Sequence, residues 1–153
     1  LLDARGFTSD DFARSHPAGA LGKRLLLHVK HLMRTGDDLP KVSPDTAMNK
    51  VLYEISNKRL GLTTVVDEQD TLLGIFTDGD LRRLIDKQQG FDIHLPVAEV
   101  MIKQPATISQ EARAVEALAQ LRDKKINQFV VVNDAHQVIG VISMHDLIQA
   151  GVN

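Results

Sequence analysis

The chain contains one segment twice. Residues 42–85 align with residues 108–151 without a gap, at a constant offset of 66 positions. The identical pairs include Ser43 and Ser109, Leu52 and Leu118, Lys58 and Lys124, Gly74 and Gly140, and Asp80 and Asp146. Each unit of an internal repeat leaves an apolar face that its sister can cover. The duplication therefore predicts two similar units packed together, and it directs the search for function towards paired binding sites.

Composition and charge exclude several classes of protein. A chain of 153 residues is long enough for one compact domain or two small ones pressed together. A net charge of −2, one tyrosine and no tryptophan provide neither a basic stripe nor stacking platforms, so we expect no nucleic-acid partner. The apolar runs are too short to cross a bilayer, which predicts no membrane partner. The absence of cysteine excludes disulfides, and the histidines lack metal-ligand spacing, so we expect no metal site.

The repeated segment predicts the same five elements in each copy: strand, helix, strand, strand and helix. In the first copy, a short strand at Lys41–Val42 leads to a helix with Ser43 as the expected N-cap and Pro44 as the first helical residue. Ser109 is the matching N-cap in the second copy. The expected strand pairs are Leu62–Val66 with Thr71–Phe76 and Gln128–Val132 with Val138–Ile142. The predicted fold class is α+β, with two βαββα-type repeats related by a pseudo-twofold axis.

Two short prefaces precede the copies. Val29–Met33 and Val97–Met101 share a pattern but lie 68 positions apart, so the first copy has two more residues between its preface and its repeat. A linker from Gln88 to Pro96 separates the copies. The expected domains are residues 1–27, which belong to neither copy, a first repeat at 28–90 and a second repeat at 91–153.

The most specific local pattern is a glycine, two apolar residues, a threonine or serine, two variable residues and an aspartate. It occupies residues 74–80 and again residues 140–146. We expect the hydroxyl to end a strand and the carboxylate to lie in the first turn of a helix that begins near Asp78 or Met144.

Two interpretations of this pattern stay open. A helix N-terminus and a hydroxyl suit a phosphate, and a carboxylate can accept two ribose hydroxyls, so the pattern can grip a nucleotide. The same pattern is also a capping box, in which both side chains only satisfy backbone N–H groups. The candidate nucleotide contacts are Thr77, Asp80, Ser143 and Asp146.

The two copies differ where a phosphate would lie. Asp78 adds a negative charge in the first copy, whereas His145 in the second copy can donate a hydrogen bond to a phosphate. His145 is therefore a fifth candidate contact, and if only one site is occupied, we expect the one that includes Ser143 and Asp146.

From about Val29 to Val152, the duplicated motif and the paired valines that precede it resemble a tandem pair of CBS domains. This resemblance implies two clefts that often bind adenine nucleotides through the motif hydroxyl and aspartate. It also implies that the ligand packs near residues 60–64 and 126–130.

Residues 4–7, 15–22 and 76–83 resemble the bacterial D-arabinose 5-phosphate isomerases, in which a sugar isomerase (SIS) domain precedes a CBS pair. This resemblance implies a cytoplasmic parent enzyme that interconverts ribulose 5-phosphate and arabinose 5-phosphate for Kdo and lipopolysaccharide synthesis. It implies an active-site role in that parent for His16, which lies in a Ser-His-Pro block. The chain itself is then a C-terminal piece, which we expect to be catalytically inert.

Two functions fit this resemblance. In the first, AMP, ATP or CMP-Kdo binds between the repeats as a regulatory ligand and biases the SIS domain, while catalysis requires no cofactor. In the second, the pair binds nothing and serves as a scaffold that dimerises and spaces the isomerase domains. A homo-oligomer formed through the CBS pair is expected in either case.

Overall fold

The computed structural model describes residues 26–88 and 92–153. The first copy consists of β1 (Lys41–Val42), α4 (Met48–Lys58), β2 (Leu62–Val66), β3 (Leu72–Thr77) and α5 (Asp78–Gln88). The second copy consists of β5 (Thr107–Ile108), α6 (Ala114–Lys124), β6 (Gln128–Val132), β7 (Val138–Ser143) and α7 (Met144–Gln149). The predicted order of elements is confirmed in both copies, and β3 and β7 end on the motif hydroxyls. His16 lies outside the described residues.

Each copy forms its own small sheet. In the structure the linker between the copies runs beyond the predicted Pro96 to residue 106, directly before β5. The first sheet has the order β1-β2-β3-β4, in which β4 (Ile102–Lys103) comes from this longer linker, and the second has the order β5-β6-β7. The first and second strands of each copy run parallel, and the next two form an antiparallel hairpin. All five residues of β2 are buried, because the strand is central in its sheet and both faces are covered.

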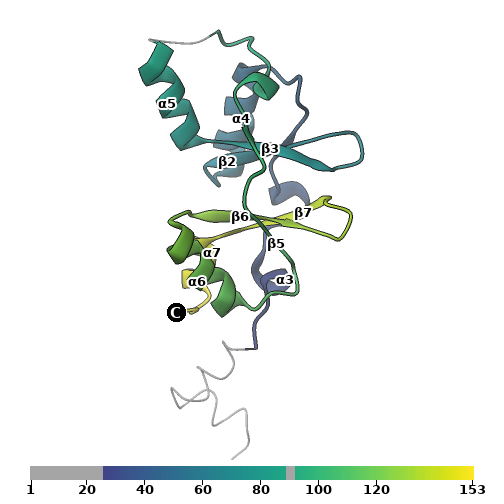
Figure 1. Ribbon diagram of the computed structural model, residues 1–153, viewed down its shortest axis with the longest axis vertical. Helices are drawn as coiled ribbons and strands as arrows, with labels where there is room; N and C mark the ends of the chain where they lie inside the picture. Colours follow the sequence, from purple (N-terminus) through teal and green to yellow (C-terminus); the bar gives the residue numbers. More distant parts are fainter. Residues whose placement is uncertain (1–25, 89–91) are drawn as a thin grey trace, which may run out of the picture.

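The two sheets lie face to face across the middle of the molecule (Figure 1). α4 and α5 cover the outer side of one sheet, and α6 and α7 cover the outer side of the other. Between the sheets lies an apolar cluster of Leu39, Leu60, Leu62, Val66, Leu72, Val130, Val138 and Val141. The hairpins also bond directly, since the Leu72 N–H donates to the His136 carbonyl at 3.0 Å and the Val138 N–H donates to the Asp70 carbonyl at 2.8 Å. Each copy thus covers the apolar face of its sister.

Each preface, together with the residue that directly follows it (Arg34 or Ile102), crosses from one copy to the other. α3 (Val29–Leu32) packs Val29 into the core of the second copy, and Arg34 forms a β-bridge with Val141 on β7. A single-turn helix, η2 (Val97–Glu99), packs into the core of the first copy, whose β3 then pairs with β4. The expected repeat boundaries, 28–90 and 91–153, divide the chain in sequence order. In the structure, each preface instead packs into the core of the other copy.

The predicted N-caps at Ser43 and Ser109 are wrong. Ser43 belongs to a turn, in which its hydroxyl contacts Asp45, and α4 begins later with Ala47 as N-cap. The first free N–H of α4, on Met48, donates to the Leu95 carbonyl at 2.9 Å. α6 begins at Ala114, whose N–H donates to the Leu27 carbonyl at 2.9 Å. Carbonyls of segments that cross between copies therefore satisfy helix N–H groups for which a side-chain cap had been predicted.

Candidate functional site

In the first copy, Thr77 and Asp80 hold each other across the start of α5. The Asp80 N–H donates to Thr77 Oγ1 at 3.1 Å, and the Thr77 N–H donates to Asp80 Oδ2 at 3.0 Å. Arg83, one turn further along α5, donates from Nη2 to Asp80 Oδ1 at 2.6 Å. The capping interpretation is confirmed here. The Thr77 hydroxyl oxygen only accepts a hydrogen bond in the cap, so the hydroxyl proton can still be donated to a ligand.

In the second copy, the carboxylate has a different partner. Ser143 Oγ again accepts from the Asp146 N–H, at 3.0 Å, and caps α7. The Asp146 carboxylate, however, accepts two hydrogen bonds from Arg34, at 3.2 Å from Nε and 3.0 Å from Nη2. This hydrogen bonding raises the pKa of Arg34 against the opposing effect of its burial. His145 is exposed on α7.

A cavity of about 610 Å³ opens between the copies, on the side of the Thr77 motif. Its volume lies within the range of about 300–1,000 Å³ that is typical of small-molecule sites. The first copy contributes Gly61, Leu62, Ile75, Thr77, Asp78, Gly79 and Arg83. The linker contributes Ile102, Gln104, Pro105 and Ala106, and the second copy contributes Lys125, Ile126, Asn127, Gln128 and Val130.

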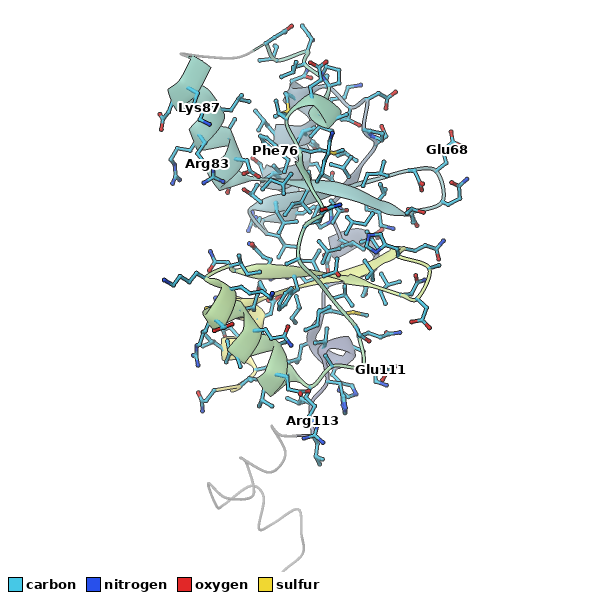
Figure 2. The ribbon with its side chains drawn as sticks, in the orientation of Figure 1. Glu68, Phe76, Arg83, Lys87, Glu111 and Arg113 are labelled. Carbon is cyan, nitrogen blue, oxygen red and sulfur yellow. The ribbon has the colours of Figure 1, made fainter. Side chains whose placement is uncertain are left out.

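The lining of the cavity contains both charged and apolar side chains. Two cations, Arg83 and Lys125, outnumber one carboxylate, Asp78, so the charged side chains of the lining favour an anion, while Arg83 is also bonded to Asp80 outside the lining. The Arg83 guanidinium lies over the first turn of α5, because an added Cβ on Gly79 would come 3.4 Å from its Nη2. Figure 2 shows Arg83 and Lys87 on α5, with Arg83 nearer to the second copy. The apolar part of the lining consists of Leu62, Ile75, Ile102, Pro105, Ile126 and Val130.

The starts of β2 and β6 meet at this cavity. Gln128 Nε2 donates to the Leu60 carbonyl at 3.0 Å, which joins the two copies at the edge of the cavity. Gly61 and Leu62 line it from one copy, and residues 126–128 line it from the other. The segments 60–64 and 126–130, predicted to pack against a ligand, thus contribute to one shared cavity.

The structure does not bring all five candidate residues together. Thr77 lines the cavity, whereas Asp80 borders a separate hollow of about 220 Å³ beside Phe76 and Val100. Ser143, His145 and Asp146 lie at the junction of β7 and α7 and are not among the residues that line the cavity.

Sequence reasoning missed Lys125 and the linker residues of the cavity. Lys125 follows α6 in the left-handed conformation, with φ of 59°, and Arg59 takes the same place after α4 with φ of 61°. The recurrence of a cation just after both first helices was a signal in the sequence. Pro105 gave no comparable signal, because its place depends on how the linker crosses between the copies.

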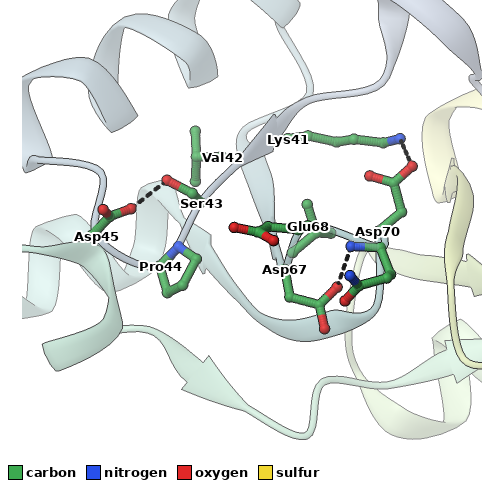
Figure 3. Close-up of a pocket in the computed structure, with 10 residues that line it drawn as sticks. Lys41, Val42, Ser43, Pro44, Asp45, Asp67, Glu68 and Asp70 are labelled. Carbon is green, nitrogen blue, oxygen red and sulfur yellow. Dashed lines mark hydrogen bonds and ion pairs between the residues drawn. The ribbon is translucent and has the colours of Figure 1, made fainter.

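A second large cavity, of about 670 Å³, lies between β1 and the tip of the β2–β3 hairpin (Figure 3). Its charged lining is mainly acidic: Asp45, Asp67, Glu68 and Asp70, with Lys41 bonded to Asp70 at 3.1 Å. These carboxylates disfavour an anionic ligand.

Within residues 26–88 and 92–153, no cluster of three or more His, Cys, Asp or Glu side chains could hold a metal ion. The same ranges contain no helix that is long and apolar enough to cross a membrane.

Known proteins provide three comparisons. The family model for the CBS domain matches residues 29–87 and 97–153. The arabinose 5-phosphate isomerase KdsD of Pseudomonas aeruginosa is 48% identical over 153 residues, which cover 99% of this chain and 46% of that protein. KdsD of Escherichia coli K12 is 45% identical with the same coverage. The chain thus spans about half the length of the curated relatives it matches.

Solved structures share the fold. A CBS domain protein from Pyrobaculum aerophilum, complexed with AMP, superposes with a TM-score of 0.69 at 20% identity, over 78% of this chain and 89% of that one. A CBS-domain containing protein from Agrobacterium tumefaciens superposes with a TM-score of 0.72 at 23% identity, over 82% and 93% of the two chains. The two segments that the CBS family model matches coincide with the two copies and their prefaces. The chain therefore belongs to the CBS domain family, as a tandem pair.

Proposed function

We propose that this chain is the regulatory CBS pair of an arabinose 5-phosphate isomerase and that it binds a nucleotide or nucleotide-sugar between its two copies. Identities of 45–48% to arabinose 5-phosphate isomerases across nearly the whole chain support the first part. The parent would be a cytoplasmic enzyme that converts ribulose 5-phosphate to arabinose 5-phosphate, on the route to Kdo and lipopolysaccharide. His16 would serve its active site, in the isomerase domain that is the partner of this pair.

The observation that carries the binding proposal is the shape and charge of the 610 Å³ cavity. A phosphate would be held by the Thr77 hydroxyl, which can donate, and by the positive charge of Arg83 and Lys125. A planar base would pack against apolar side chains of the lining, such as Ile75 and Pro105. The AMP complexes of related folds agree with a ligand of this size and chemistry.

Asp80 and the three candidates of the second copy have distinct proposed roles. Asp80 holds the Thr77 backbone and the Arg83 guanidinium in place, and it can turn to ribose hydroxyls when Arg83 moves to the phosphate. Ser143, His145 and Asp146 hold the corresponding positions in the second copy and would contact a ligand only there, where Arg34 already occupies the carboxylate.

Regulation requires a ligand that distinguishes two states of the protein. The proposed site can do so because it is built from both copies and from the linker, so its ligand stabilises one arrangement of all three. CMP-Kdo, as an end product, would give feedback, and AMP or ATP would report the energy state. In the enzyme that carries the isomerase domain, the effective ligand should change the rate of ribulose 5-phosphate isomerisation.

Calorimetry of the chain with AMP, ATP and CMP-Kdo tests binding. We expect saturable heat from at least one ligand, and a loss of affinity on the order of tenfold in Thr77→Val and Arg83→Gln. Arg82→Gln is the matched control, because Arg82 is the exposed neighbour of Arg83 and does not line the cavity. Wild-type heat that survives both cavity variants would place the ligand elsewhere, and no heat from any of the three ligands would contradict the proposal.

Exposed apolar side chains on the outer helices favour a second function, that of a scaffold. Tyr53 on α4, Ile85 on α5 and Ile148 on α7 are 71%, 43% and 51% exposed. A contiguous apolar patch marks contacts between protein chains, and these side chains are candidates for one on the described surface. A dimer by light scattering that dissociates in Tyr53→Lys or Ile85→Lys, together with no heat in the titrations, would favour the scaffold over the sensor.

The chain alone is proposed to be catalytically inert. Aldose–ketose isomerisation needs a base, a proton shuttle and a phosphate pocket held in register. The purified 153-residue chain should therefore not isomerise ribulose 5-phosphate, and turnover above a buffer blank would refute this part of the proposal.

A further inference from the structure

Arg34 and Ile102 occupy equivalent places in the two copies. Arg34 exchanges two backbone hydrogen bonds with Val141 on β7, at 2.8 and 3.1 Å. Ile102 pairs with Ile75 on β3, and Ile75 corresponds to Val141 at the offset of the repeat. The backbone of each crossing preface is thus fixed beside the last strand of one copy, but one preface presents an arginine there and the other an isoleucine.

The two side chains make different contacts beside the motif. Ile102 lines the 610 Å³ cavity of the first copy without reaching its carboxylate. Arg34 extends to Asp146 and donates to both carboxylate oxygens. The pair is partly withdrawn from water, with 35% of the Arg34 side chain and 15% of the Asp146 side chain exposed. A bidentate contact of this kind fixes the guanidinium in one orientation.

The two extra residues of the first copy lie on the same segment. They form part of η1 (Gly36–Asp38), a single-turn helix between Arg34 and β1. The Lys58 ammonium donates to the Asp37 carbonyl and ties this turn to the end of α4. The Asp38 carboxylate adds an attraction for Arg34 from the same turn. The arginine is therefore held from its backbone, from its carboxylate partner and from the turn that follows it.

The first copy also has an arginine on its carboxylate, but that arginine is free to move. Arg83 comes from α5, the same helix as Asp80, and its side chain is 66% exposed. It lines the cavity itself, so it can turn towards a ligand phosphate while the Thr77 N–H still holds Asp80. Arg34 is held more firmly, because its side chain is only 35% exposed and two of its nitrogens donate to Asp146.

We propose that Arg34 acts as a built-in occupant of the second cleft, so that each chain binds one nucleotide, at Thr77, rather than two. This inference rests on the proposed nucleotide-binding function and specifies its stoichiometry. The chain's own guanidinium takes the contacts on Asp146 that ribose hydroxyls would otherwise make. Which residue stands at the crossing position then determines whether a cleft is open or closed.

The test exchanges the two crossing residues and counts bound AMP by calorimetry and equilibrium dialysis. Wild type should bind one AMP per chain, and Arg34→Ile should bind two. Ile102→Arg should close the first cleft and lower AMP affinity on the order of tenfold or more. Arg34→Lys keeps the positive charge, so this variant should still bind one AMP per chain. Arg34→Gln is a second opening variant, in case isoleucine disturbs folding, and circular dichroism checks each variant for the wild-type fold.

The outcomes separate this inference from the function on which it rests. Two AMP per wild-type chain, or one AMP in both Arg34→Ile and Arg34→Gln, would overturn the closure by Arg34. No AMP on wild type but one on Arg34→Ile would support the closure and contradict the proposed site at Thr77. No AMP on any folded variant would overturn both.

Discussion

The Ile102 carbonyl oxygen lies 2.6 Å from the position that a Cβ on Gly74 would occupy. In the second copy, a Cβ on Gly140 would lie 2.7 Å from Met33 Sδ and 3.0 Å from the Arg34 carbonyl oxygen. Both contacts come from the crossing prefaces. The glycine that opens each repeated motif is therefore explained by the exchange of prefaces between the copies, and not by contact with a ligand.

Gly74→Ala should destabilise the fold by about 1–3 kcal/mol, because a methyl group at this site overpacks against backbone that cannot turn away. Chemical denaturation with urea measures the free energy of unfolding. Gly140→Ala should act in the same direction, with a smaller loss, since its nearest contact is the flexible end of Met33.

Gly79→Ala is the matched control for these glycines. Its Cβ would meet Arg83 only at 3.4 Å, within ordinary contact distance, and it lies in the first turn of α5. Its free energy of unfolding should stay within about 1 kcal/mol of wild type, on the stabilising side, because alanine favours a helix. Equal losses in Gly74→Ala and Gly79→Ala would show that the crossing preface is not what excludes a side chain at Gly74.

The two arginine–aspartate pairs should differ in strength. A double-mutant cycle of Arg34→Gln with Asp146→Asn should give a coupling free energy of about 1 kcal/mol, after allowance for screening by solvent. The corresponding cycle of Arg83 with Asp80 should give about 0.5 kcal/mol or less, because Arg83 is mostly exposed.

Salt provides the control for this comparison. Raising the ionic strength to about 1 M shortens the screening length to roughly 3 Å and should reduce the Arg83–Asp80 coupling by the larger fraction. A stronger coupling for the exposed pair, in either buffer, would contradict the fixed position assigned to Arg34.

Ser143, which caps a helix, should contribute more to stability than Ser43, which does not. Ser143→Ala should cost about 1 kcal/mol, since its buried hydroxyl accepts the Asp146 N–H at the start of α7. Ser43→Ala should cost less than about 0.5 kcal/mol, because Ser43 is exposed and lies in a turn ahead of α4. Thermal unfolding of both variants measures the difference. A larger loss of stability in Ser43→Ala than in Ser143→Ala would support Ser43 as the helix cap predicted from the sequence.

Glu111 should titrate below its ordinary pKa of 4.5, because Lys30 donates a hydrogen bond to its carboxylate at 2.9 Å. A lowered folded-state pKa stabilises the fold above the unfolded-state pKa, and this contribution disappears as the pH falls through the folded-state pKa. NMR titration should show the Glu111 pKa returning towards 4.5 in Lys30→Gln but not in Lys50→Gln, which removes an exposed lysine of α4. An unchanged Glu111 pKa in Lys30→Gln would exclude Lys30 as the cause.

Local pattern was enough to predict β2, β6 and the motif, and it placed β3 and β7 to within one residue, but it did not predict β4. β2 and β6 begin and end where apolar runs predicted, and the hydroxyl and carboxylate of each motif lie at the strand–helix junction as expected. These features depend on neighbours within a few residues, such as the Thr77–Asp80 bonds. Repetition at a fixed offset also predicted that the two copies cover each other.

Contacts between distant residues were beyond such reasoning. Arg34 and Asp146 are 112 positions apart, and their pairing depends on the crossing of the first preface onto β7. The same crossing moves the helix starts, because carbonyls such as Leu95 replace the predicted side-chain caps. The differences between the two copies in the sequence, Asp78 in the first and His145 in the second, favoured the second cleft as the ligand site. The cavity beside Thr77 and the pairing of Arg34 with Asp146 favour the first cleft instead. The difference between Arg34 and Ile102 was a signal in the sequence for this asymmetry.

The central proposal is that a nucleotide binds between the copies at Thr77, and amide NMR spectra of the chain titrated with AMP test it most directly. The largest shift changes are expected at Gly61, Thr77, Gly79, Ala106 and Gln128, which line the 610 Å³ cavity, with small changes from Val141 to Asp146. Largest changes around Ser143 and Asp146, or an unchanged spectrum at millimolar AMP, would contradict it.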